Sequence, residues 1–179
     1  MTKTLRLGAA GIAMFAALGM SSAAHADTAT ADATAEILDA LVLNNTSALD
    51  FGTMVVSGAG SVTLFSDGSL DCSAADIICS GTTSVAGFTV EGTAAKAVTI
   101  NLPTGDVELR HPSYTAATAA EHSIILNTFT SSENGGSGPE VTLDATGNAG
   151  FDVGGTITLD GTEEAGVFDA TFDVSVEYS

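Results

Sequence analysis

The sequence predicts an all-β fold, an antiparallel β-sandwich over residues 37–179, and three observations predict it. Apolar and polar residues alternate with period two in many short stretches, as in strands with one buried face. Gly, Asn, Asp, Ser and Pro separate these stretches, as in chains that turn often. Thr, Ser and Gly are abundant and Lys and Arg are few, which disfavours long surface helices. The length of 179 residues suits one such domain.

The first 26 residues have the order of a secretory signal peptide. Lys3 and Arg6 form a basic start, an apolar run follows over 7–20, and Ala24-His25-Ala26 is an A-x-A cleavage site. A membrane anchor is the alternative, but the run is shorter than the roughly 20 residues that a span needs. We therefore expect export through the inner membrane, cleavage before Asp27 and no membrane span in the mature chain.

The mature chain is strongly acidic. All 22 Asp and Glu residues follow residue 26, where Lys96 and Arg110 are the only bases, so the net charge is 2 − 22 = −20 with His neutral. Such a surface repels phosphate groups, which argues against nucleic acid and anionic membranes as partners. Solubility outside the cell explains this charge most simply, and a specific cationic ligand is the alternative.

Period-two alternation locates the expected strands at 61–64, 88–91, 98–102, 141–143 and 157–159. Turn signals lie at 66–68, 102–105 and 160–161.

Three further segments give weaker signals. Residues 33–43 and 114–122 have some helix propensity, yet we expect a strand at 37–43 and a loop at 114–122. Residues 131–140 are rich in Gly and Ser and predict a flexible connection.

Cys72 and Cys79 are the only cysteines, and in an exported chain they predict a disulfide. The closed loop is short, so the chain-entropy model gives about 2.5 kcal/mol for the bond. A redox or metal-binding role is disfavoured because the spacing is not C-x-x-C and two further ligands are missing nearby.

The C-terminal 14 residues show the longest alternation in the chain. Gly166 is fourteenth from the end and Tyr178 is second from the end. Every second residue from 168 to 178 is predicted to face inward: Phe168, Ala170, Phe172, Val174, Val176 and Tyr178. This ending resembles that of subunits of chaperone–usher fimbriae. The chain also resembles a family of uncharacterised exported bacterial domains, through Leu49-Asp50-Phe51-Gly52 and Val153-Gly154-Gly155-Thr156.

The fimbrial resemblance implies an immunoglobulin-like, pilin-like sandwich that lacks one strand. The residues from Gly166 to Tyr178 would border the resulting groove between subunits. A periplasmic chaperone would fill the groove first, an outer-membrane usher would assemble the subunits, and the N-terminal extension of the next copy would replace the chaperone by strand addition. The implied function is a structural subunit of a surface fimbria.

Residues 27–36 are the candidate donor strand of this scheme. Polar residues alternate there with small apolar ones, and the inward positions would be Ala29, Ala31, Ala33, Ala35 and Ile37. Two alternatives remain: 27–35 is a disordered leader, or 33–43 is the first strand of a complete domain.

No catalytic motif is present in the sequence, so we expect neither an enzyme nor a cofactor. We also expect no metal site, since His111 and His122 are the only mature histidines and the oxygen-rich segment 144–148 fits a turn better than a calcium loop. The alternative to a fimbrial subunit is a self-contained, monomeric β-sandwich that binds a ligand in the periplasm or outside the cell.

Overall fold

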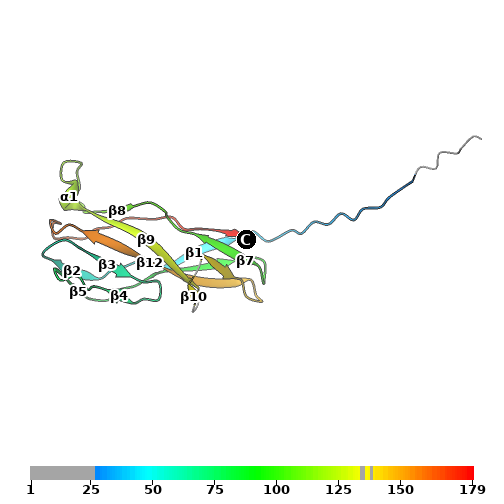
Figure 1. Cartoon of the computed structure of the whole chain (residues 1–179), viewed down its shortest axis with the longest axis horizontal. Helices are drawn as coiled ribbons and strands as arrows, with labels where there is room; N and C mark the ends of the chain where they lie inside the picture. Colours follow the sequence, from blue (N-terminus) through cyan, green and yellow to red (C-terminus); the bar gives the residue numbers. More distant parts are fainter. Residues whose placement is uncertain (1–26, 134–135, 138) are drawn as a thin grey trace, which may run out of the picture. The chain divides into compact units, whose positions relative to one another are not determined.

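The computed structural model describes residues 27–133, 136–137 and 139–179 (Figure 1). The chain divides into two units, one ending at Glu36 and one running from Ile37 to Ser179. Residues 27–36 form no helix or strand, and all of them are exposed. No helix in the described part of the chain has the length and apolar character that a membrane crossing requires. The predicted signal peptide lies outside the described residues.

The unit from Ile37 to Ser179 confirms the predicted all-β fold. The described residues form strands and one helical turn, α1. The bounds are β1 Val42–Ser47, β2 Thr53–Val56, β3 Gly60–Leu64, β4 Leu70–Asp71, β5 Ile77–Ser80, β6 Ala86–Glu91, β7 Ala97–Asn101, β8 Val107–Arg110, α1 Ala119–His122, β9 Ser123–Glu133, β10 Gly136–Ser137, β11 Glu140–Thr142, β12 Asn148–Leu159 and β13 Ser175–Tyr178.

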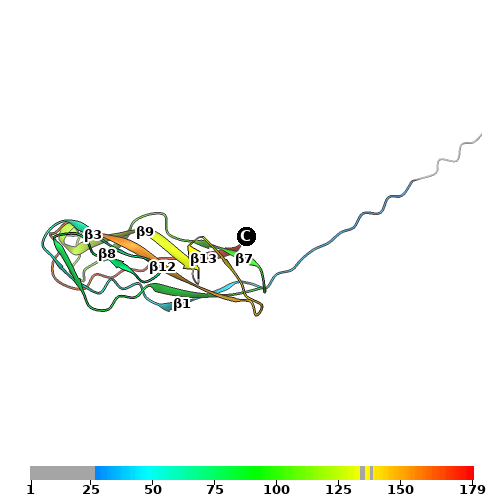
Figure 2. The ribbon, with the colours of Figure 1, turned by 60° about the horizontal axis from the view of Figure 1, so that its bottom comes forward.

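The long strand β12 organises the largest sheet (Figure 1). One of its edges pairs with β9, and the other pairs first with β6 and then with β3. Four more strands extend the sheet: β1 pairs with β6, β4 pairs with β3, and β8 and β10 both pair with β9. A second sheet has the order β11-β7-β13, and β2 pairs with β5 as a separate ribbon. In both ribbon views β7 and β13 lie side by side at the C-terminus (Figures 1 and 2).

The core consists of two apolar clusters between these sheets. The first surrounds Val62, Leu64 and Ile157, and the second surrounds Val90 and Val98. The alternation of the strands supplies these residues, because every second side chain of β3, β6, β7 and β12 points inward. Three partly buried side chains pack against both clusters and join them: Leu49, Phe129 and Phe172.

Several predicted boundaries are wrong. The first strand begins at Val42 and not at residue 37, because Ile37 is 94% exposed and 37–41 pairs with no described strand. Residues 131–140 are not a uniform flexible connection: β9 continues to Glu133 and pairs with β10. The expected loop at 114–122 ends in the single turn of α1.

The C-terminal tail is not one continuous strand as predicted. Its backbone makes an isolated bridge from Asp169 to Arg110, the last residue of β8, and only 175–178 then pairs with β7. The tail therefore passes from the edge of the large sheet to the edge of the three-stranded sheet, and the residues between these contacts have no ladder. The side-chain alternation nevertheless holds, since Phe172, Val174 and Val176 are half-buried and their neighbours are exposed.

The predicted disulfide is confirmed: Cys72 and Cys79 are bonded, with their Cα atoms 6.2 Å apart. Cys79 lies in β5 opposite Met54 of β2, so the bond fixes the loop that leads into this ribbon.

Candidate functional site

A groove with an apolar floor lies between the early part of the domain and its C-terminal tail, and its walls also carry Asp50, Glu163 and Glu164. The cavity has a volume of about 700 Å³. One wall is the segment 49–56, which ends in β2, and the other is the segment 163–168 of the tail. Side chains of β8, β9 and β12 form its floor: Leu109, Ile124, Ile157 and Leu159.

The groove resembles an unfilled strand position in the sandwich. Ile124, Ile157 and Leu159 of its floor are only 1–7% exposed, so the cavity opens directly onto the core. β2 has β5 as its one strand partner in the described residues, and the tail at 163–168 belongs to no strand. Val55 of the first wall and Val167 of the second are 62% and 73% exposed. The groove thus presents apolar side chains between β2 and a tail segment that is not part of a strand.

The tail residues predicted to border a groove occupy two different places. Gly166 and Phe168 line the cavity. Phe172 packs between the two core clusters, where its ring centroid lies 4.9 Å from that of Phe129. Val174, Val176 and Tyr178 pack against the second cluster, and Ala170 is exposed.

β13 has one free edge. It is the last strand of its sheet and pairs only with β7 among the described residues. The penultimate residue anchors it: the Tyr178 hydroxyl donates to the carbonyl of Asp39 and accepts the Thr93 N–H, both at 2.8 Å. These bonds join the chain end to the start of the domain.

Gly166 is needed because a histidine ring lies directly over it. A Cβ atom at this position would lie 2.1 Å from Nε2 of His111. Because Gly166 has no side chain, the tail can lie directly against His111, the residue that follows β8. The sequence pattern located Gly166 but gave no reason for it.

His111 and His122 come together beside this glycine, although 11 positions separate them in the chain. Their rings stack with centroids 5.2 Å apart, and Glu164 of the tail binds Nε2 of His122. His122 is 6% exposed. Its hydrogen bond, and then its charge, hold the pKa of Glu164 below the ordinary value. Sequence analysis missed this cluster, since no spacing pattern connects 164 with the two histidines.

The five predicted donor positions lie at the N-terminal end of the described chain. Ala29, Ala31, Ala33 and Ala35 belong to the first unit, and Ile37 begins the second. All five are exposed and none pairs with a described strand.

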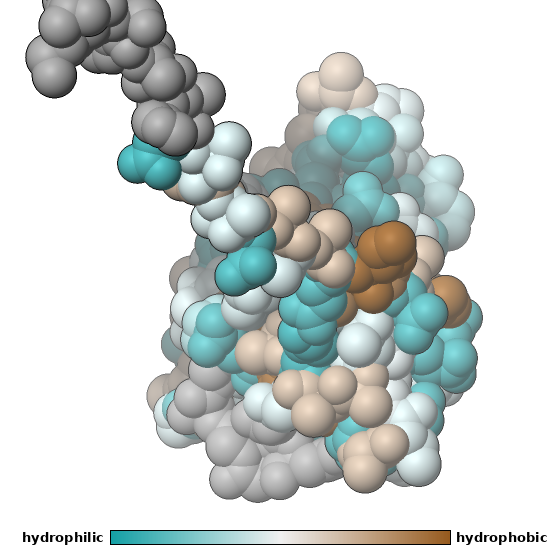
Figure 3. Space-filling view, turned by 90° about the vertical axis from the view of Figure 1, so that its right-hand side faces the viewer, coloured by the Kyte–Doolittle hydropathy of each residue, from teal (hydrophilic) through white to brown (hydrophobic). Residues whose placement is uncertain are grey.

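On the face of the molecule that Figure 3 shows, hydrophilic side chains predominate and strongly hydrophobic ones occur in small spots.

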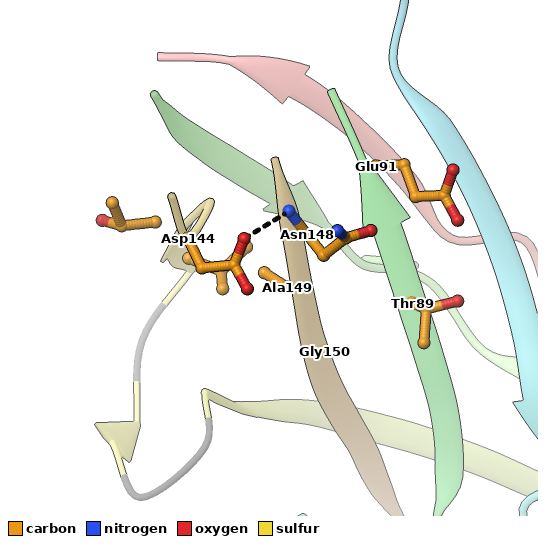
Figure 4. A pocket seen from close by; sticks show the side chains of 8 residues that line it. Thr89, Glu91, Asp144, Asn148, Ala149 and Gly150 are labelled. Carbon is orange, nitrogen blue, oxygen red and sulfur yellow. Dashed lines mark hydrogen bonds between the residues drawn. The ribbon is translucent and has the colours of Figure 1, made fainter. Parts of the chain in front are cut away.

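The oxygen-rich segment 144–148 forms a closed turn beside a cavity of about 460 Å³ (Figure 4). One carboxylate oxygen of Asp144 accepts three hydrogen bonds, from the N–H and hydroxyl groups of Thr146 and from the N–H of Asn148. Gly147 supplies the required positive φ of 82°. This oxygen of Asp144 is therefore engaged by the turn.

Three turns of this kind, closed by Asp67, Asp144 and Asp160, predict that the free energy of unfolding falls in acid. Hydrogen bonds to their carboxylates lower the pKa of all three aspartates. The main donor is the Ser69 hydroxyl for Asp67, the backbone N–H of Asn148 for Asp144, and the Thr162 hydroxyl for Asp160. Since these pKa values are depressed below the unfolded value of about 3.9, the stability they add is present above that pH and is lost as pH falls through the folded values. NMR titration of the carboxyl carbons should give midpoints below that value; an Asp144 midpoint at or above it would contradict the turn.

Comparison with known proteins gives one match. The family model described as "Domain of unknown function (DUF4402)" matches residues 41–178, which is most of the chain. No curated protein and no solved structure matches. The coarser of the two sequence resemblances, to a family of uncharacterised domains, is thereby confirmed.

Proposed function

Because the chain belongs to the DUF4402 family, described as a domain of unknown function, we propose a function from the geometry. The protein is a structural subunit of a surface fimbria, and it assembles by donating its N-terminal segment as a strand to the next copy. The observation that carries this proposal is the groove with an apolar floor between residues 49–56 and 163–168.

The groove needs an occupant of extended form. Its floor consists of core side chains, and water in contact with them costs about 25 cal/mol for each Å² of apolar surface. An exposed strand edge beside such a surface favours pairing with another chain and therefore aggregation. A strand laid between β2 and the tail removes both costs, because its backbone pairs with a free edge and its alternate side chains cover the floor.

Residues 27–37 have the properties of that occupant. They are exposed, they form no helix or strand, and their small apolar side chains fall at every second position. Eleven residues in extended form span roughly 35 Å, more than the eight residues of the wall at 49–56.

A chaperone and an usher complete the proposal. A subunit with an open groove needs a temporary strand after export, which a periplasmic chaperone supplies, and an outer-membrane usher then exchanges it for the next subunit. The final location is the cell surface.

The sharpest test compares inward with outward positions of the proposed donor strand. The paired change Ala31→Asp and Ala33→Asp introduces two charges at the inward positions, whereas Thr30→Asp and Thr34→Asp introduces the same charges at outward ones. We expect the first variant to abolish filaments seen by electron microscopy, because burying unpaired carboxylates is costly. The second should assemble as the unaltered protein does. All four positions lie in the first unit, so folding of the sandwich should be unaffected.

Two results would contradict the proposal. Equal assembly by both variants would show that the alternation has no structural role. A stable, filament-free monomer of the unaltered protein, exported without any chaperone, would favour the alternative of a self-contained binding module.

A further inference from the structure

A transition-metal site is the further inference that the structure carries furthest. We infer that His111, His122 and Glu164 bind a divalent ion of the Zn²⁺ class. The potential ligand atoms of the three residues all lie within 4.8 Å of one another. They come from three separate parts of the fold: the end of β8, the end of α1 and the tail after β12. The site is complete within one chain and does not depend on the fimbrial proposal.

His122 is already oriented as a metal ligand would be. Its Nδ1 lies 2.7 Å from the Thr118 hydroxyl oxygen, and its Nε2 faces the Glu164 carboxylate. Histidine ligands commonly use one ring nitrogen for a neighbouring oxygen and the other for the metal. The ring is buried, so this orientation is held by packing.

His111 is the third ligand, and metal binding by its ring requires a change in its proton position and hydrogen bonding. Its ring is fixed by stacking on His122 and by contact with Phe168, whose centroid is 5.4 Å away. Its Nδ1 accepts the Ser113 N–H at 3.1 Å, which places the proton of the neutral ring on Nε2. Binding through Nε2 therefore requires that proton to move to Nδ1 and the Ser113 bond to open. The Nε2 proton of His122 must also move to Nδ1, but there the Thr118 hydroxyl oxygen already faces it and no backbone bond has to open, so His111 should contribute less to affinity than His122.

The donor set selects the class of ion. Two imidazole nitrogens and one carboxylate oxygen form a known zinc ligand set, with bonds of about 2.0–2.2 Å. A tetrahedral arrangement with these bonds separates the ligand atoms by roughly 3.3 Å, so movements of about 1 Å are sufficient. The Glu164 side chain is 57% exposed, which leaves a fourth position open to water. Nickel and copper also accept imidazole, whereas magnesium and calcium prefer oxygen ligands.

An ion at this site would join the tail to the large sheet. Glu164 and Phe168 line the groove, so the ion would hold that wall against His111 and His122. Binding to the folded state alone raises stability, and at 100 times the dissociation constant the melting temperature should rise by roughly 5–10 °C.

The test is Zn²⁺ titration of the purified exported protein after treatment with a chelator, in 150 mM salt with excess Mg²⁺ to suppress general attraction to the acidic surface. We expect one equivalent to bind and Glu164→Gln to weaken binding at least tenfold, and His111→Asn to weaken it less than a His122 variant does. Glu163→Gln is the matched control, because it removes the same charge one residue away. Each carboxylate oxygen of Glu163 accepts one backbone N–H, from Asp160 and from Gly161, and Gln can keep only the bond to its single amide oxygen. The melting temperature of this variant without metal is therefore measured beside its affinity.

The readouts are calorimetry, the Zn²⁺-dependent shift in melting temperature and the visible spectrum of the Co²⁺ form, which reports coordination geometry. If Glu164→Gln and Glu163→Gln lower the affinity equally, the binding is general electrostatic attraction and the site is refuted. Absence of a one-equivalent binding step in the unaltered protein refutes it as well. Glu164 is exposed, so its variant should fold even if a His122 variant does not.

Discussion

Replacing Gly154 by Ala should prevent the domain from folding stably. Gly154 lies in β12, where a Cβ atom would lie 2.2 Å from the carbonyl oxygen of Leu64 and 2.7 Å from backbone atoms of Phe65 and Ser66. All of these are main-chain atoms, so no side-chain rotation can relieve the overlap. We expect the free energy of unfolding to fall by about 3–5 kcal/mol, the range of severe single substitutions.

Gly150→Ala is the matched control in the same strand. Its Cβ atom would meet only the Phe88 carbonyl oxygen, at 3.5 Å, an ordinary contact. This change should be neutral or slightly stabilising, because Ala restricts the unfolded chain more than Gly does. Urea unfolding followed by far-UV circular dichroism measures both variants. Equal midpoints would show that β3 and β12 can separate at Gly154 without cost.

The fold could be predicted from the sequence because its signal is local. Strands with one wet face alternate visibly, so 61–64 and 88–91 correspond closely to β3 and β6. β12 was recognised only in its last residues, because Gly150, Gly154 and Gly155 interrupt its alternation. In β9 the buried residues Ile124 and Leu126 enclose another apolar residue, Ile125, so the sequence shows an apolar run there and no alternation.

The site depends on information that is not local. Gly166 and Phe168 of the tail pattern line this cavity, and their place in an interface between subunits stays a prediction. The opposite wall and the floor could not be predicted, since they come from β2, β8 and β9, whose positions depend on the pairing of distant strands. The histidine cluster depends on the same pairing: residues 111 and 122 meet 164 only because β8, β9 and β12 are successive neighbours in one sheet.

Replacing Phe172 by Asp should disrupt both folding and assembly. Phe172 is half-buried, contacts both core clusters and packs against Phe129 at 4.9 Å. The change removes an aromatic contact worth about 0.5–1.5 kcal/mol together with part of the 1.5–3 kcal/mol expected for a buried Phe. It also brings a carboxylate close to apolar side chains. A loss of roughly 3 kcal/mol follows, and filaments should disappear because the tail can no longer hold its place beside the core.

Thr171→Asp separates the effect of position from that of charge. Thr171 is the preceding residue and is exposed, so it receives the same carboxylate on the solvent side of the tail. We expect its unfolding midpoint in urea and its filament yield to equal those of the unaltered protein. If the two variants behave alike, the inward direction of alternate tail residues has no energetic role. If Phe172→Asp alone loses stability, the alternation that marks the chain end in the sequence is what fixes the tail to the core, and the groove beside it keeps its shape for an incoming strand.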